Sequence, residues 1–348
     1  MKIQGAATVA QLSEFDELID ARSPAEYADD RLPGAISCPV LDDRQRARVG
    51  TLYQSSPFEA KKIGAIWVAQ NVAAHIERLF LAKPRDWRPL VYCWRGGQRS
   101  GAFTHILRQI GWDAQRLEGG YKGWRRHVLD ELATLPQRFD YRVINGATGS
   151  GKSRLLEALA AEGAQVLHLE QLARHKGSVL GPLPQTQQPS QRLFESSIHA
   201  RLRGFDSERP VFVEAESRRI GVLQLPDALL AAIRAARSLR IEAGLAARVE
   251  FLLRDYDYFL ADPTWLVERL EQLKGLQSGE TVARWKALAQ AGEFPALVSE
   301  LLTAHYDPLY QRSQTRNFAG FAAATPIESS DLSPAAMARL AREILQRS

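Results

Sequence analysis

The sequence has only two cysteines among its 348 residues, Cys38 and Cys93. Two cysteines cannot form a disulfide framework, and their scarcity is typical of a reducing compartment. No stretch approaches about 18 uninterrupted apolar residues, so no membrane span is predicted. The first residues lack a basic region followed by an apolar run, which argues against a secretory signal. We therefore expect a cytoplasmic protein that does not bind a membrane.

The charge balance is mildly basic. Lys and Arg number 45 against 40 Asp and Glu, a formal net charge of +5. This excess favours a polyanionic partner but does not establish one, since many basic enzymes bind no nucleic acid. A hydrophobic content of 45% and a charged content of 24% are ordinary for a globular protein. The length suits two domains better than one.

Two glycine-rich loops stand out as anion-binding elements. The first spans residues 93–99 and reads CWRGGQR; the second spans residues 146–153 and reads GATGSGKS. The first offers a nucleophilic sulfur among backbone N–H groups. The second matches the phosphate-binding pattern GxxxxGK[ST], in which glycines let backbone amides approach phosphate oxygens. Together they indicate chalcogen transfer coupled to a phosphorylated ligand.

The cysteine loop follows a short apolar strand predicted at 89–92 and precedes a helix with apolar residues at helical spacing from Ala102 to Ile110. Backbone amides and the helix N-terminus stabilise a thiolate in such a loop. They would equally hold a terminal sulfur or selenium anion, or a phosphoryl group. We predict Cys93 and Arg99 as catalytic. The rest of the active-site loop is Trp94, Arg95, Gly96, Gly97 and Gln98. Cys38 is interpreted as a packing residue.

The phosphate loop has the context that its motif requires, a strand predicted at 141–145 before it and a helix at 154–161 after it. Lys152 should reach phosphate oxygens, and Ser153 could ligate Mg²⁺. Glu214, at the end of a strand predicted at 211–213, is a candidate metal or acid–base residue. The predicted phosphate-binding residues are Gly146, Gly149, Ser150, Gly151, Lys152 and Ser153. These amides would hold ATP or a diphosphate ester alike.

The fold class is α/β. Residues 1–130 predict a parallel sheet with flanking helices and an insertion at about 41–88, and residues 138–348 predict a P-loop NTPase-like α/β domain. From about 226 the pattern is mostly helical, and residues 177–189 form an aperiodic loop. Arginines recur after Glu214 on segments interpreted as helices: Arg218, Arg219, Arg234, Arg237, Arg240, Arg248 and Arg254. Arg218 and Arg219 are the candidates for RNA or phosphate contact. Most of the others are interpreted as solvated faces with pairs such as Arg240–Glu242 and Arg248–Glu250.

Three separated motifs in the first 130 residues resemble the rhodanese family. They are residues 18–27 (LIDARSPAEY) with 32–36 (LPGAI), the cysteine loop, and residues 118–124 (EGGYKGW). The resemblance implies a persulfide or perselenide on Cys93. Asp20, Arg22 and Glu26 are interpreted as buried scaffold contacts. The Cys-x5-Arg spacing also resembles rhodanese-related dual-specificity phosphatases, although Tyr92 stands where many of these have a histidine.

A rhodanese module followed directly by a P-loop module resembles the tRNA 2-selenouridine synthase family over essentially the whole chain. The resemblance implies conversion of 2-thiouridine at the tRNA wobble position to 2-selenouridine through an S-geranyl intermediate. The implied substrates are geranyl diphosphate and selenophosphate, with Mg²⁺ possible and no tightly bound cofactor. The implied partners are the anticodon region of tRNA and a selenophosphate supply enzyme.

Two other readings remain open from the residues alone. One is an ATP- or polyphosphate-dependent switch whose rhodanese module only docks a partner. The other is a small-molecule kinase fused to a sulfurtransferase, or more generally an ATP-dependent sulfurtransferase. Neither would need tRNA.

Overall fold

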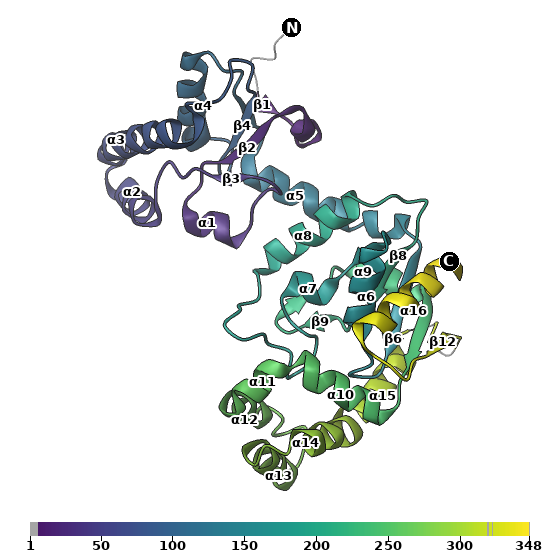
Figure 1. The fold of residues 1–348 in the computed structure, drawn as a ribbon. Coiled ribbons are helices and arrows are strands. Elements are labelled where there is room, and N and C mark those ends of the chain that lie inside the picture. The colour runs from purple at the N-terminus through teal and green to yellow at the C-terminus, as the bar shows by residue number, and fades with distance from the viewer. Residues whose placement is uncertain (1–5, 319, 322, 348) are drawn as a thin grey trace. The chain divides into compact units, whose positions relative to one another are not determined.

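The computed structural model describes residues 6–318, 320–321 and 323–347, and the side chains of 313–317 are excluded. The chain divides into two compact units. The first comprises residues up to 131 together with 195–200, and the second comprises 132–194 and 201 onwards. Each unit contains one five-stranded parallel sheet. The predicted α/β class is therefore confirmed for both halves of the chain (Figure 1).

The first unit is built on a sheet of order β1-β5-β4-β2-β3. Its strands are β1 (Ala6–Ala7), β2 (Glu17–Asp20), β3 (Ile36–Ser37), β4 (Pro89–Tyr92) and β5 (Gln115–Leu117). Its helices are η1 (Val9–Glu14), α1 (Pro24–Asp29), α2 (Asp43–Ser55), α3 (Pro57–His75), η2 (Ile76–Phe80), α4 (Gln98–Ile110) and α5 (Gly120–Leu132). Strand β4 is buried at every position, as expected for a central parallel strand. The cysteine loop therefore starts from the buried centre of the sheet.

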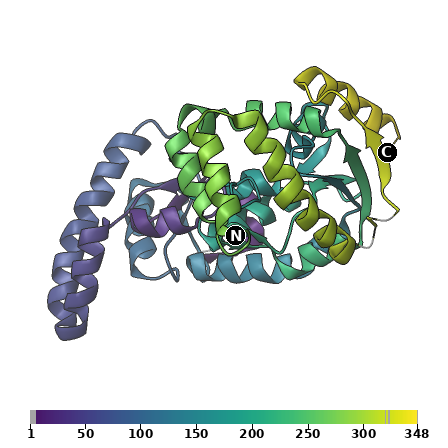
Figure 2. The ribbon, with the colours of Figure 1, turned by 90° about the horizontal axis from the view of Figure 1, so that it is seen from below.

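The insertion between β3 and β4 folds as a helical hairpin. Helices α2 and α3 run side by side, joined at Ser56, in Figure 2. An Asp42 capping box begins α2, with the Asp42 carboxylate accepting a hydrogen bond from Gln45 N at 2.7 Å. Cys38 lies in the adjoining core at 0% exposure, and burial raises its pKa to about 12. The structure thus confirms Cys38 as a packing residue.

The second unit has a sheet of order β12-β11-β6-β8-β7. Its strands in this sheet are β6 (Tyr141–Gly146), β7 (Gln165–Leu167), β8 (Val211–Glu214), β11 (Arg237–Glu242) and β12 (Thr325–Glu328), and a short hairpin adds β9 (Arg219–Ile220) and β10 (Leu223–Gln224). Its helices up to β11 are η3 (Leu135–Arg138), α6 (Lys152–Ala161), α7 (Leu169–Ala173), α8 (Gln191–Arg203) and α9 (Asp227–Ala235). The middle of α8, residues 195–200, belongs to the first unit.

Helices dominate the rest of the second unit. They are α10 (Leu245–Asp255), α11 (Asp257–Ala261), α12 (Pro263–Glu271), α13 (Gly279–Gln290), α14 (Phe294–Leu301), η4 (Leu302–Tyr306), α15 (Asp307–Asn317) and α16 (Pro334–Arg347). Helices α11–α14 enclose an apolar core of their own around Trp285, Leu270 and Leu297. The mostly helical character predicted from residue 226 is confirmed, with β11 and β12 as additions.

Two arginine predictions need correction. Arg237 and Arg240 lie on strand β11, which pairs with β6 and β12, and not on a helix. Arg219 lies on strand β9 and Arg218 directly before it, so neither of these is on a helix. The predicted Arg240–Glu242 pair is present at 2.6 Å because residues i and i+2 of a strand share a face. The predicted Arg248–Glu250 pair is wrong. On helix α10 such residues diverge, and Arg248 instead binds Asp307 at 2.8 Å.

Candidate functional site

The cysteine loop connects buried strand β4 to helix α4. Cys93 is 3% exposed, and its Sγ lies 3.2 Å from Ser100 Oγ in the first turn of α4. The Ser100 hydroxyl also lies 3.3 Å from the Gly97 carbonyl, so its single proton can serve either neighbour. If the cysteine is a thiolate, Ser100 donates to the sulfur and the N-terminus of α4 adds its positive dipole. Ser100 was missed from the sequence, although its place in the first turn after the loop is a usable signal.

Glycines hold the cysteine loop against the start of α5. Tyr121 N donates to the Cys93 carbonyl at 2.8 Å, and Lys122 N donates to the Trp94 carbonyl at 2.9 Å. Gly120 has φ +56°, and a Cβ there would lie 2.3 Å from Cys93 O and 2.4 Å from Gly96 N. No side chain fits this approach. The EGGYKGW segment therefore supports the cysteine loop directly, and much of what looked turn-rich in sequence is the first turn of α5.

The scaffold residues of the first unit form two ion pairs. Arg22 binds the buried Asp20 carboxylate at 2.6 Å. Arg99, predicted as catalytic, binds Glu26 through both terminal nitrogens at 2.6 and 3.2 Å. Although burial opposes it, the pairing with Arg99 lowers the pKa of Glu26. The interpretation of Asp20, Arg22 and Glu26 as structural contacts agrees with these bonds, and Arg99 is oriented by α1.

The remaining loop residues are distributed around this frame. Trp94 is half-buried, with its ring 5.2 Å from that of Tyr121, whereas Arg95, Gly97 and Gln98 are exposed or nearly so. Gly96 adopts φ +67°, where a Cβ would meet Leu117 O at 2.8 Å. The helical hairpin α2–α3 lines a cavity together with Gln98, Arg99 and Ala102 of α4. Cys93 does not itself line this cavity.

The phosphate loop connects β6 to α6 in the second unit. Gly146, Gly149 and Gly151 have φ +157°, +79° and +81°. Lys152 Nζ donates to the Gly146 carbonyl at 2.8 Å and to the Ala147 carbonyl at 3.3 Å, folding back over the loop. Ser150 is buried at 1% exposure beneath the loop, and its hydroxyl has no hydrogen-bond partner in the described structure. The loop thus has the form that the motif predicts.

Residues from other elements support this loop. Tyr310 on α15 accepts a hydrogen bond from Gly146 N at 2.7 Å, and its ring centroid is 5.7 Å from Lys152 Nζ. Arg248 is buried and donates to the Thr148 carbonyl at 3.2 Å. The interpretation of Arg248 as part of a solvated face is therefore wrong, and Tyr310 was not singled out. Both lie more than ninety positions from the motif, and only the fold brings them to it.

Three glutamates gather beside Lys152. Glu214, at the end of β8, accepts from Glu170 N at 2.7 Å and lies 3.2 Å from His168 Nδ1. Glu170 Oε2 accepts from the Ser153 hydroxyl at 2.7 Å. A Cβ on Gly177 would lie 2.6 Å from Glu170 Oε1 and 3.0 Å from Glu216 Oε1, so the two carboxylates flank one backbone position. Glu170 and Glu216 were missed from the sequence.

The electrostatics of this cluster follow from burial and like charge. Desolvation and the neighbouring carboxylates raise the pKa of Glu216 well above its ordinary value and raise that of Glu170. Desolvation lowers the pKa of Lys152 against the pull of the same glutamates. For His168, burial lowers the pKa, but the hydrogen bond to Glu214 outweighs it and the pKa is raised. A bound cation or polyphosphate–metal complex would relieve this crowding.

The donor set beside the loop suits Mg²⁺. A hydroxyl oxygen and carboxylate oxygens are the ligands that this ion prefers, and Ser153 and Glu170 already converge at hydrogen-bond distance. Glu214, the residue predicted for this role, bonds to the backbone of Glu170 and to His168 instead. These bonds use Glu214 Oε1 and hold Glu170 in position, while Glu214 Oε2 is buried without a hydrogen-bond partner in the described structure.

An apolar pocket adjoins the phosphate site. Its walls come mostly from α11, α12 and α14, with Leu180 from the loop before α8. They include Leu180, Phe259, Leu266, Phe294, Leu297 and Val298. Thr148 of the phosphate loop lines both this pocket and the larger polar one around Lys152. Ser178, Leu252, Tyr256 and Tyr306 also line both. The phosphate loop thus stands between a polar cavity and an apolar one.

The arginines proposed for phosphate or RNA lie outside these pocket walls. Arg218 pairs with Asp227 at 2.8 Å, and both side chains are exposed, while Arg219 is exposed on β9. Both arginines are exposed at the surface, and both follow Glu216 closely in the sequence. The part of the chain that the structure describes contains no helix long and apolar enough to cross a membrane.

Comparison with known proteins gives consistent matches to both halves. Residues 139–265 match the family model of the tRNA 2-selenouridine synthase AAA domain, and residues 5–127 match that of the rhodanese-like domain. A tRNA 2-selenouridine synthase of Nitrosomonas europaea is 35% identical, covering 73% of this chain and 66% of that protein. Its counterpart from Bdellovibrio bacteriovorus is 30% identical over 86% of this chain and 89% of that one. That of Cupriavidus pinatubonensis is 34% identical over 81% and 76%.

Proposed function

Because the chain belongs to the tRNA 2-selenouridine synthase family, we propose that it converts 2-thiouridine at the tRNA wobble position to 2-selenouridine. The conversion proceeds in two steps, through an S-geranyl intermediate. Geranyl diphosphate supplies the alkyl group and selenophosphate supplies selenium. A selenophosphate-producing enzyme is the expected partner upstream.

The observation that carries the first step is the apolar pocket next to the phosphate loop. ATP and a prenyl diphosphate present the same phosphate chemistry to the loop amides, but only the prenyl compound has an apolar tail to bury. Thr148 borders both cavities, so the tail of a diphosphate held by the loop would point toward the apolar walls that α10, α11 and α14 form. This arrangement supports geranyl diphosphate over ATP as the ligand.

In the alkylation step, the sulfur of 2-thiouridine attacks C1 of geranyl diphosphate. The C1–O bond breaks, diphosphate leaves with the bonding electrons, and the base loses its N3 proton. The loop amides and Lys152 hold the developing charge on diphosphate. Mg²⁺, bound through Ser153 and Glu170, would neutralise part of that charge.

In the second step, selenium replaces the S-geranyl group at C2 of the base. Alkylation matters because a thiolate leaves carbon far more readily than a sulfide dianion does. The selenium of selenophosphate attacks C2, the C2–S bond breaks and geranyl thiolate leaves with the bonding electrons, and water then cleaves the Se–P bond to release phosphate. The Cys93 loop holds the anionic selenium donor, because Ser100 and the α4 N-terminus stabilise negative charge there. We assign contact with the base or the geranyl chain to Trp94, which is half-buried in the same loop.

The experiment separates the two steps with one variant of each loop. Purified protein is incubated with a 2-thiouridine-containing anticodon stem-loop, geranyl diphosphate, selenophosphate and Mg²⁺, and nucleosides are identified by mass spectrometry. Lys152→Ala should abolish geranylation yet still selenate pre-geranylated RNA. Cys93→Ala should accumulate geranylated RNA.

Two outcomes contradict this assignment. Normal geranylation by Lys152→Ala would show that the phosphate loop does not bind geranyl diphosphate for this reaction. If ATP hydrolysis depended on Lys152 instead, the loop would belong to a nucleotide. If Cys93→Ala formed selenouridine at the wild-type rate, Cys93 would have no role in selenium transfer.

A further inference from the structure

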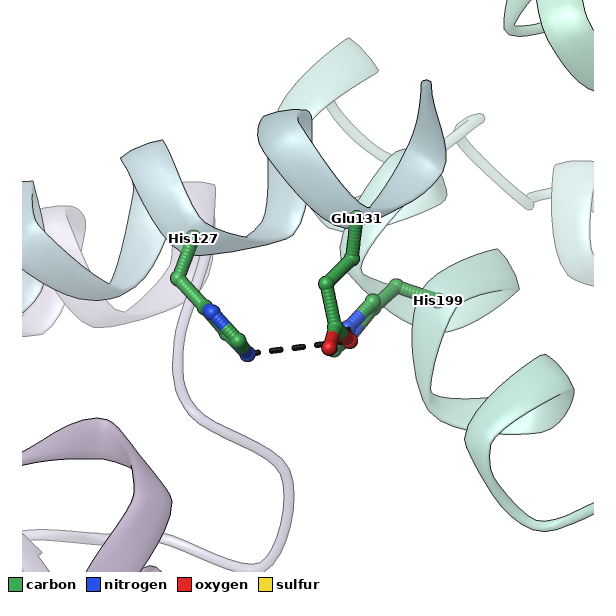
Figure 3. Close-up of side chains that lie close together, drawn as sticks. All are labelled: His127, Glu131 and His199. Carbon is green, nitrogen blue, oxygen red and sulfur yellow. Dashed lines mark hydrogen bonds and ion pairs between the residues drawn. The ribbon is translucent and has the colours of Figure 1, made fainter. Parts of the chain in front are cut away.

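A second cluster of potential ligands lies away from both loops, in the first unit. His127 and Glu131 stand one turn apart on α5, and His199 lies on the part of α8 that belongs to the same unit. Figure 3 shows the three side chains pointing toward a common centre. Glu131 Oε2 lies 2.6 Å from His199 Nε2 and 3.6 Å from His127 Nε2. All three ligand atoms lie within 4.8 Å of one another.

The chemistry of this set is that of a transition-metal site. Two imidazoles and a carboxylate are recurrent zinc ligands, with bonds of about 2.0–2.2 Å. Ligands at those distances around one ion stand roughly 3–3.5 Å apart, so modest side-chain rotation would close the set. Three protein ligands leave a fourth position for water. Spacing of i and i+4 places His127 and Glu131 on one face of α5.

The surroundings orient the ligands and leave an approach for an ion. The Trp124 ring lies 5.4 Å from that of His199 and 5.9 Å from that of His127. The His199 side chain is 4% exposed, whereas Glu131 and His127 are 26% and 36% exposed. Buried His199 thus fixes the inner end, and solvent reaches the outer two ligands. Nearby, Arg125 pairs with Glu195 and Ser196 donates to Asp30 at 3.0 Å, which keeps this stretch of α8 in register.

We propose that His127, Glu131 and His199 bind a zinc-class divalent metal ion. The ion would join α5 to residues 195–200 of α8. Helix α5 is also the helix whose first turn supports the cysteine loop. The inference does not depend on the proposed function, because no residue of either anion-binding loop takes part. The competing reading is a His–carboxylate hydrogen bond without metal.

The test titrates Zn²⁺ into chelator-treated full-length protein by calorimetry, with excess Mg²⁺ to occupy hard-cation sites. All variants carry Cys93→Ser, which removes the exchangeable thiol of the other site. The Cys93→Ser protein, which is the parent of the other variants, should bind one zinc ion more tightly than any further zinc ion. It should also melt at a higher temperature with zinc than without it. His127→Ala should weaken this event on the order of a hundredfold or more, beyond the effect of losing an outer-shell partner.

Two further variants make the result decisive. His105→Ala removes an exposed histidine on α4 and should leave zinc affinity unchanged. Glu131→Gln keeps a hydrogen-bonding oxygen for His199 but should lower the affinity for zinc, because a neutral amide is a poor zinc ligand. Equal zinc affinity in the parent and His127→Ala overturns the proposal. An equal loss in His105→Ala also overturns it, because the binding would then be non-specific.

Discussion

The Ser153 hydroxyl donates a hydrogen bond to Glu170 Oε2 at 2.7 Å, joining the last residue of the phosphate motif to a helix seventeen positions away. Glu170 N donates a hydrogen bond to Glu214 Oε1 at 2.7 Å, and Glu214 lies at the end of strand β8. The pair presents two oxygens side by side at the phosphate loop. Under the proposed function, we expect a metal-bound diphosphate to be held at this contact.

We predict that Glu170→Gln weakens Mg²⁺-dependent binding of diphosphate about tenfold, through loss of one charged ligand. Calorimetry with inorganic diphosphate at fixed Mg²⁺ measures this. Glu162→Gln, an exposed substitution just beyond the end of α6, is the matched control and should not change affinity. Unchanged affinity in Glu170→Gln would show that Glu170 is not a metal ligand.

We predict that Gly120→Ala disrupts the cysteine loop and selectively impairs selenation. Its Cβ would lie 2.3 Å from Cys93 O, and the left-handed φ of +56° adds strain of about 1–3 kcal/mol. Gly111→Ala is the control, since Gly111 also has positive φ but a Cβ there would meet no described atom within 4 Å. Selenation and geranylation rates are measured separately. Equal selenation by the two variants would contradict the packing role of Gly120.

We predict that Glu216→Gln gains stability relative to the wild type as pH rises. The pKa of Glu216 is raised in the folded protein, so the folded state binds more protons than the unfolded state above about pH 4.5. Wild-type stability therefore falls as pH rises from there toward the folded-state pKa, and the glutamine variant lacks this loss. Thermal melting of both proteins from about pH 4.5 to about pH 7.5 checks the difference. Parallel pH profiles would argue that Glu216 titrates normally.

We predict that Val298→Trp raises the KM for geranyl diphosphate by roughly tenfold or more. Filling the apolar pocket excludes two or three carbons of the tail, each worth about 0.8 kcal/mol on burial. Binding of inorganic diphosphate should not change. Ala296→Trp places the same residue on the exposed face of α14 and serves as control. If both variants keep the wild-type KM, the tail binds elsewhere.

Local motifs predicted much of the architecture. Strands β4 and β6 and the helices after them were recognised because each loop needs a strand before it and a helix after it. Strand β11 was not recognised. Its sequence RSLRIE has Arg240 and Glu242 on one face and Arg237 on the other, and the arginines around it suggested helices. Pairing with β6 and β12 decides its conformation.

The sequence by itself determined the two anion-binding loops, because glycine spacing and the reactive Cys93 and Lys152 are encoded within a few residues. Only the tertiary structure decided which side chains serve those loops. Ser153 bonds to Glu170, Gly146 bonds to Tyr310, and Thr148 lines the apolar pocket. These are tertiary contacts, and no local sequence pattern indicates them. The physical reason is that the backbone conformation of these two loops is specified by neighbours in sequence, whereas the side chains around them depend on packing between distant elements.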